Sequence, residues 1–135
     1  MARNKPVIAL ADTPAHLDLL SRILTNAGYT PLCCRNEQET RERVAATHPA
    51  LLIVDPLLEP RDGGVRLVLQ LRENARTRRL PVLVCSSDQA FLRTQAERLR
   101  GLGCAVLAKP FDLEAFLTTV AALLRHRAAR AADAL

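Results

Sequence analysis

The sequence predicts an α/β fold in which a parallel sheet is covered by helices on both faces. Five short apolar runs alternate with five predicted helices, most of which have apolar residues at helical spacing. Such alternation is typical of right-handed βαβ units, which build parallel sheets. The run 51–54 has four consecutive apolar residues and no polar alternation. That pattern suits a central strand buried on both faces, so helices must cover both sides of the sheet.

The bulk composition indicates one globular domain with an aliphatic core. At 135 residues the chain is long enough to bury a core, and aromatic residues make up only 3% of it. The formal net charge is +5, but the basic residues are mostly arginines spread along predicted helix faces. No basic run is interleaved with aromatic residues that could stack on bases. We therefore expect a solvated arginine-rich surface and no direct contact with nucleic acid.

The cysteines predict neither a zinc site nor a disulfide framework. They show no C-x-x-C spacing and lie in strand-like apolar stretches, where a free thiol acts as a small hydrophobe. The chain also has no signal peptide and no apolar run near 18 residues, so we expect a cytoplasmic protein without a membrane segment. The four are Cys33, Cys34, Cys85 and Cys104.

The first strand–helix unit is clearly delimited. An apolar run over 7–11 predicts a strand that stops at Asp12. Thr13 then serves as an N-cap, with Pro14 at the first helical position, where its missing N–H costs nothing. Leucine and isoleucine follow at helical spacing until Gly28, which predicts the end of the helix.

The second strand–helix unit and the central strand come next in the sequence. We predict a strand over 29–34 and a helix over 36–47 that opens with a capping-box-like Asn-Glu-Gln-Glu sequence. The central strand 51–54 delivers Asp55 to its carboxyl end. Pro56 then terminates the strand because it supplies no N–H for a ladder.

The second half of the chain repeats the alternation. We expect a loop over 55–64 containing two glycines, a helix over 65–75, and a strand over 80–85 with Pro81 at its entrance. The remaining predicted elements are a helix through about Arg100 capped by the Ser86-Ser87-Asp88 segment, a strand over 104–108, a turn over 109–111, and a helix from the Asp112 cap to at least Leu124. The Ala/Arg-rich segment 125–135 is predicted to extend this helix and then fray.

Polar residues follow four of the predicted strands. They are Asp12, Asp55, Ser86 and Lys109. In a parallel sheet all four lie at the carboxyl edge, where ligands bind. Two carboxylates suit a hard cation such as Mg²⁺, whereas a hydroxyl and an ammonium suit phosphoryl oxygens. The set therefore predicts transfer of a phosphoryl group to an aspartate carboxylate.

With these residues in place, the chain resembles a receiver domain of the bacterial two-component response-regulator family over about residues 5–124. Asp55 matches the phospho-accepting aspartate, with Asp62 and Gly63 at the family's spacing in the following loop. Ser86 matches the switch hydroxyl. The turn that begins at Lys109 matches the family's Lys-Pro-Phe, in which the Lys-Pro peptide bond is typically cis.

The resemblance implies a flavodoxin-like (βα)5 fold of strand order 2-1-3-4-5, with a receiver domain over 1–124 and a tail over 125–135. It implies Mg²⁺ bound by Asp12, Asp55 and the backbone carbonyl of Leu57. It also implies a signalling domain rather than an enzyme, catalysing only its own Mg²⁺-dependent phosphorylation and dephosphorylation. The expected partners are a histidine kinase or phosphotransfer protein, a downstream protein and a possible second copy in a homodimer. We expect a single-domain protein, because no DNA-binding output domain fits after Leu124.

Several departures from the family pattern are present, and two of them, at Ala11 and Val106, leave an alternative open. Ala11 stands where the first of two adjacent acids is usual, which predicts weak Mg²⁺ binding. Pro56 removes a backbone N–H beside the acceptor, and Val106 replaces an aromatic switch residue. The alternative is a degenerate receiver that docks proteins independently of phosphorylation. It is opposed by the retention of Asp12, Asp55, Ser86 and Lys109. A flavodoxin-like enzyme is more remote, because the chain has no Gly-rich phosphate loop and no nucleophile elbow.

Overall fold

The computed structural model describes residues 5–60 and 63–133, and its elements alternate as the sequence predicts. The strands are β1 (Val7–Ala11), β2 (Thr30–Cys34), β3 (Leu51–Val54), β4 (Val82–Ser86) and β5 (Cys104–Ala108). The helices are α1 (Pro14–Asn26), α2 (Glu37–Thr47), α3 (Gly63–Glu73), α4 (Gln89–Gly101) and α5 (Leu113–Asp133). None of these helices combines the length and apolarity needed to cross a bilayer.

All neighbouring strands pair in parallel, and their order is β2-β1-β3-β4-β5. The predicted flavodoxin-like fold is therefore confirmed. Two of the three inner strands, β1 and β3, pair through Ile8–Leu51 to Ala11–Val54. Every residue of β3 is buried, as its unbroken apolar run predicts.

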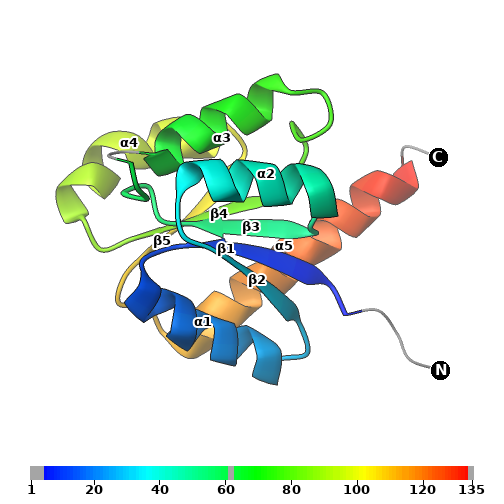
Figure 1. Cartoon of the computed structure of the whole chain (residues 1–135), viewed down its shortest axis with the longest axis horizontal. Helices are drawn as coiled ribbons and strands as arrows, with labels where there is room; N and C mark the ends of the chain where they lie inside the picture. Colours follow the sequence, from blue (N-terminus) through cyan, green and yellow to red (C-terminus); the bar gives the residue numbers. More distant parts are fainter. Residues whose placement is uncertain (1–4, 61–62, 134–135) are drawn as a thin grey trace.

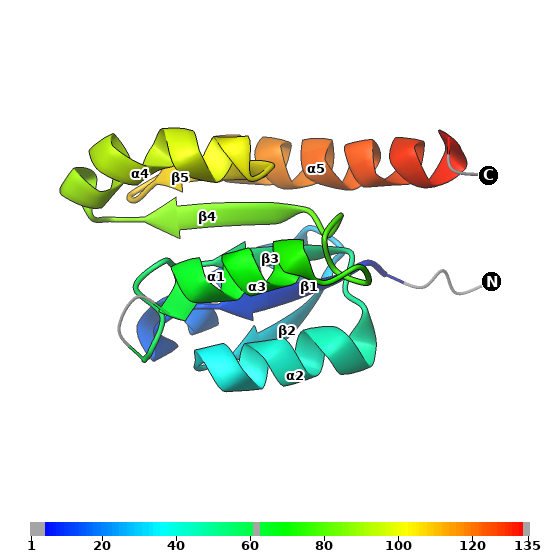
Figure 2. The same ribbon diagram turned by 90° about the horizontal axis from the view of Figure 1, so that it is seen from above.

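Helices cover the two faces of the sheet in separate layers (Figure 1). One core cluster joins the sheet to α2, α3 and α4, with Val44, Leu67 and Leu99 among its members. The other joins the opposite face to α1 and α5, through residues such as Leu20 and Phe116. Seen from above, α5 runs along β4 and β5 and continues past them toward the C-terminus (Figure 2). Two apolar layers therefore hold the sheet rigid from both sides.

The helix caps read from the sequence are largely present. The side chain of Asn36 accepts a hydrogen bond from the Glu39 N–H at 2.8 Å, as an N-cap should. Asp88 accepts one from the Phe91 N–H at 2.9 Å in the same way. Thr13 precedes α1 in an extended conformation but makes no side-chain cap, so Pro14 is the operative start signal there.

Two predicted boundaries are wrong. Helix α3 begins at Gly63 rather than Val65, so the two glycines belong to the helix and not to the loop. Strand β4 spans Val82–Ser86 rather than 80–85 because Pro81 contributes only its carbonyl, which accepts from the Leu52 N–H at 3.0 Å. Helix α5 continues without a break past Leu124 and reaches Asp133.

Candidate functional site

Three of the predicted site residues meet at the carboxyl edge of the sheet. Asp12 directly follows β1, Asp55 follows β3 and Lys109 follows β5. Their exposed fractions are only 2%, 6% and 9%. Buried charges are stable only when they are paired. The charged side chains at this edge of the sheet therefore form a buried ionic cluster and are not solvent-exposed surface charges.

Lys109 is the centre of that site. Its Nζ lies 2.7 Å from Asp12 Oδ2 and 3.1 Å from Asp55 Oδ2. Burial lowers the pKa of Lys109, but the hydrogen bonds and negative charges of Asp12 and then Asp55 outweigh burial and raise it overall. The ammonium is therefore held in its charged form between two carboxylates. The Lys109–Pro110 peptide bond is cis, as the family resemblance implied.

The backbone around Asp55 orients its carboxylate. Oδ1 of Asp55 accepts a hydrogen bond from the Leu57 N–H at 2.8 Å, while Oδ2 points to Lys109. The start of α3 packs directly on this turn. A Cβ added to Gly64 would lie 2.6 Å from Pro56 Cα and would collide with the Asp55 carbonyl. Glycine at position 64 therefore lets the helix approach the turn that begins at Asp55, a role that sequence reasoning missed.

Ser86 lies at the same edge but faces another group. It is fully buried, and its Oγ accepts a hydrogen bond from the Asp88 N–H at 3.1 Å. Its carbonyl accepts from the Lys109 N–H at 2.8 Å, which ties the end of β4 to the turn that carries the lysine. Among the hydrogen bonds of the described residues, none joins Ser86 to Asp55.

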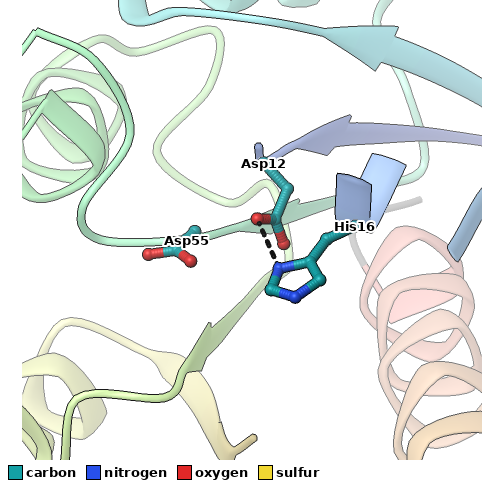
Figure 3. Close-up of side chains that lie close together, drawn as sticks. All are labelled: Asp12, His16 and Asp55. Atoms are coloured by element: carbon teal, nitrogen blue, oxygen red, sulfur yellow. Dashed lines mark hydrogen bonds and ion pairs between the residues drawn. The ribbon is translucent and has the colours of Figure 1, made fainter. Parts of the chain in front are cut away.

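His16 belongs to the site although the sequence analysis did not select it. It lies in the first turn of α1, and its Nδ1 is 3.3 Å from Asp12 Oδ1 and 3.1 Å from Lys109 Nζ. Figure 3 shows the imidazole directed toward the two carboxylates. The signal that could have found it is its spacing, because residues four apart at a helix start lie on one face.

The donor set suits a divalent cation. Asp12 and Asp55 present buried carboxylate oxygens at one place, and oxygen ligands are those that Mg²⁺ prefers. One ligand atom from each of Asp12, His16 and Asp55 lies within 4.8 Å of the others. A metal bound here would therefore be held by residues of the β1–α1 connection, of α1 and of the β3–α3 connection.

The other predicted participants fall in different places. Ala11 is fully buried in the core cluster that faces α2, α3 and α4. Val106 is half-buried and packs against the same cluster. The expectation for Asp62 concerns a residue outside the described part of the chain, and that for the Leu57 carbonyl as a metal ligand stays a prediction.

Similar proteins add an independent finding. Response regulator MprA of Mycobacterium leprae (strain TN) is 33% identical over 123 residues, which cover 89% of this chain and 51% of that protein. A sensor protein from Polaromonas sp. JS666 has a crystal structure that superposes with a TM-score of 0.82 at 26% identity, over 92% of this chain and 99% of that one.

The signal receiver domain of a putative Luxo repressor protein from Vibrio parahaemolyticus superposes with a TM-score of 0.84 at 17% identity, over 96% of this chain and 98% of that one, and shows the fold alone. No family model matches the chain. The chain spans about half the length of the curated relatives it matches.

Proposed function

Because the chain belongs to the receiver domains of the response-regulator family, we propose that it accepts a phosphoryl group on Asp55 from a histidine kinase or phosphotransfer protein. The observation that carries the proposal is the Lys109 ammonium, held 3.1 Å from the Asp55 carboxylate and 2.7 Å from that of Asp12. Receiver domains are signalling domains rather than enzymes in the usual sense, so the phosphorylated state itself is the output.

The chemistry needs a carboxylate nucleophile and neutralisation of phosphoryl charge. A carboxylate oxygen of Asp55 attacks phosphorus while the bond from phosphorus to the donor imidazole nitrogen breaks, and the electron pair of that bond stays on nitrogen. Lys109 is placed to attract the phosphoryl oxygens as they turn away from the donor. Mg²⁺ held by Asp12, Asp55 and the Leu57 carbonyl would add positive charge at the same oxygens.

Two local departures shape this proposal. Pro56 leaves one backbone N–H fewer beside the acceptor, which makes the Leu57 N–H the nearest donor after Asp55. Ala11 provides no acid to orient metal-bound water, and loss of one such supporting group typically costs about 10- to 100-fold in affinity. Phosphorylation should therefore require high Mg²⁺.

Ser86 and the protein partners belong to the later, signalling stage. We assign Ser86 the role of the hydroxyl that turns from the Asp88 N–H to the phosphoryl group once it is present. The rearranged end of β4 would then be read by a downstream protein or by a second copy of the chain. A cytoplasmic location is part of the same proposal.

The test is intact-mass spectrometry after incubation with acetyl phosphate and Mg²⁺. The wild type should gain one phosphoryl mass and Asp55→Asn should gain none. Asp18→Asn is the matched control, because Asp18 is exposed on α1 and, among the described residues, pairs with the exposed Arg22 alone. Equal labelling of Asp55→Asn would refute the assignment of the acceptor. A wild type that takes no label from any donor would refute the proposed function.

A further inference from the structure

Building on the cation site of the proposed function, we propose that Asp12, His16 and Asp55 bind a divalent transition-metal cation of the Mn²⁺ to Zn²⁺ series in preference to Mg²⁺. The inference concerns the identity of the cation, which phosphoryl transfer by itself does not decide. It rests on a nitrogen ligand that α1 brings to the two carboxylates.

The distances are close to those of a shared coordination sphere, in which ligands at about 2.1 Å from the metal are at most about 4.2 Å apart. One ligand atom from each residue lies within 4.8 Å of the others, and His16 Nδ1 is 3.3 Å from Asp12 Oδ1. Adjacent ligands of a cation bound at about 2.1 Å in octahedral geometry are about 3 Å apart. The imidazole can therefore enter the sphere with little movement of α1, as Figure 3 lets the reader follow.

The lone pair of His16 already faces a cation. An ammonium only donates, so Nδ1 must accept in its 3.1 Å contact with Lys109 Nζ. The same atom cannot at once donate to Asp12 at 3.3 Å. The contact with Lys109 is the shorter of the two, and its ammonium is buried between two carboxylates. We therefore assign Nδ1 of His16 the role of hydrogen-bond acceptor. An Nδ1 that carries no proton is what a metal requires, and the metal would take the place of the ammonium at that lone pair.

The charge of the site leaves room for a further cation. Asp12 and Asp55 carry two negative charges and Lys109 one positive charge, so the buried group has an excess of one negative charge. The ammonium now touches all three ligand residues. A divalent cation would take over those ligand atoms, and Lys109 would be released toward the phosphoryl group.

The chemistry of the ligand set decides which cation is preferred. Mg²⁺ takes oxygen ligands and gives up water reluctantly, whereas imidazole suits later divalent metals, whose affinities rise along the first-row series. Ala11 supplies no acid that would favour a hydrated Mg²⁺ at this place. His16 therefore shifts the site from an all-oxygen set to a mixed nitrogen and oxygen set.

The test compares Co²⁺ and Mg²⁺ binding by calorimetry on the full chain without a histidine tag. Cys33→Ser serves as the background, because Cys33 is the half-buried thiol and could bind Co²⁺ itself. His16→Gln should lower Co²⁺ affinity by at least about 10- to 100-fold, the loss seen when even a supporting group is removed. His126→Gln, at an exposed position on α5, should change nothing.

His16→Asp makes the test independent of a simple folding defect. This variant restores an all-oxygen set, so its ratio of Co²⁺ to Mg²⁺ affinity should fall below that of the wild type, through a gain in Mg²⁺ affinity. The visible absorption of bound Co²⁺ should also change, because it reports nitrogen ligation. An unchanged Co²⁺ affinity in His16→Gln, or an unchanged affinity ratio in His16→Asp, would overturn the inference.

The two proposals fail in different ways. Absence of phosphoryl label on the wild type with either metal would refute phosphorylation but would leave His16-dependent Co²⁺ binding intact. Conversely, suppose that Asp55 is labelled but that Co²⁺ affinity is the same with and without His16. That result would refute only the choice of cation.

Discussion

Two ion clusters flank the connection between β3 and α3, and their compositions are opposite. At the sheet edge one cation, Lys109, lies between the carboxylates of Asp12 and Asp55. At the start of α2 lies one carboxylate, that of Glu37. Its Oε2 is 3.1 Å from Arg41 Nη1, and its Oε1 is 3.0 Å from Arg66 Nε. We call them the lysine cluster and the glutamate cluster.

The clusters also differ in solvent contact. The side chains of the lysine cluster are at most 9% exposed, whereas Arg41 and Arg66 are 42% and 47% exposed. The arginines also bond to Gln70 and to the Pro60 carbonyl, so they fasten the loop to α2 and α3. The lysine cluster carries a buried excess of negative charge that suits binding of a cation. The glutamate cluster is partly exposed to solvent and links the loop to α2 and α3.

Removing the central cation should have the largest effect. Lys109→Met leaves two buried carboxylates facing each other, and loss of one partner from a buried ion pair costs about 3 to 5 kcal/mol. We expect the free energy of unfolding to fall by about 3 kcal/mol at neutral pH, measured by urea denaturation. Asp55→Asn leaves a one-to-one pair and should change stability by less than about 1 kcal/mol. Equal losses in both variants would contradict the assigned charge excess.

The adjacent glycines of α3 provide a matched pair, because each one touches a different cluster. The three atoms nearest to a Cβ on Gly64 belong to the Asp55–Pro56 backbone, whereas a Cβ on Gly63 would meet the Leu58 carbonyl at 2.6 Å and Glu37 Oε1 at 3.2 Å. Gly64→Ala should cost about 2 to 3 kcal/mol and Gly63→Ala about 1 to 2 kcal/mol. Thermal melts of the two variants show which one loses more stability.

Labelling by acetyl phosphate separates the two glycine variants further. Gly64→Ala should slow the gain of phosphoryl mass, because it moves the acceptor turn, and Gly63→Ala should not. Slowing of labelling to the same degree in both variants would show that the start of α3 acts as one unit and that the two clusters are not separable.

Breaking the glutamate cluster should have a smaller effect. Glu37→Gln removes two ion pairs whose arginines are nearly half exposed, and exposed pairs contribute about 0.2 to 1 kcal/mol each. We expect a loss of roughly 1 to 2 kcal/mol in chemical denaturation, shrinking as salt is added because solvent screens these charges. A loss that does not respond to salt would place Glu37 in the same class as the lysine cluster.

Two buried thiols, of which Cys85 lies near the lysine cluster, extend the tests to high pH. Burial raises the pKa of the Cys85 thiol from 9.0 to about 12 and that of Cys34 to about 11. The folded state therefore keeps protons that the unfolded state loses above pH 9, so stability falls as pH rises from 9 through these values. Between pH 8 and pH 10, Cys85→Ala should lose about 1 kcal/mol less stability than the wild type. Parallel pH profiles for both proteins would contradict this.

The local elements and the placement of the site were readable in the sequence. The caps at Asn36 and Asp88 act on neighbours three residues away, so their sequence context suffices to predict them. Asp12, Asp55 and Lys109 could be assigned to one edge because parallel strands end on the same side. Their meeting follows from chain direction, which the alternation of strands and helices already implies.

What only the tertiary structure decided are the contacts of individual side chains. The spacing of four residues already places His16 near Asp12, but its contact with Lys109 depends on how α1 packs against the sheet. The Ser86 hydroxyl faces Asp88 rather than Asp55, because a hydroxyl takes whichever donor the local turn offers. Glycine is needed at the two positions where α3 begins, because a Cβ there would collide with backbone from the preceding turn.

The pairing of charges in the two ion clusters also depends on tertiary packing. Arg66 reaches Glu37 across 29 residues, and Lys109 reaches Asp12 across 97. Charges so distant in the chain pair only after the two apolar layers have brought β1, β5, α2 and α3 together. The sequence by itself determined the fold and the edge at which the site lies, because both follow from backbone topology. Packing decided which side chains share that edge, because side-chain contacts depend on distances that hydrophobic periodicity does not encode.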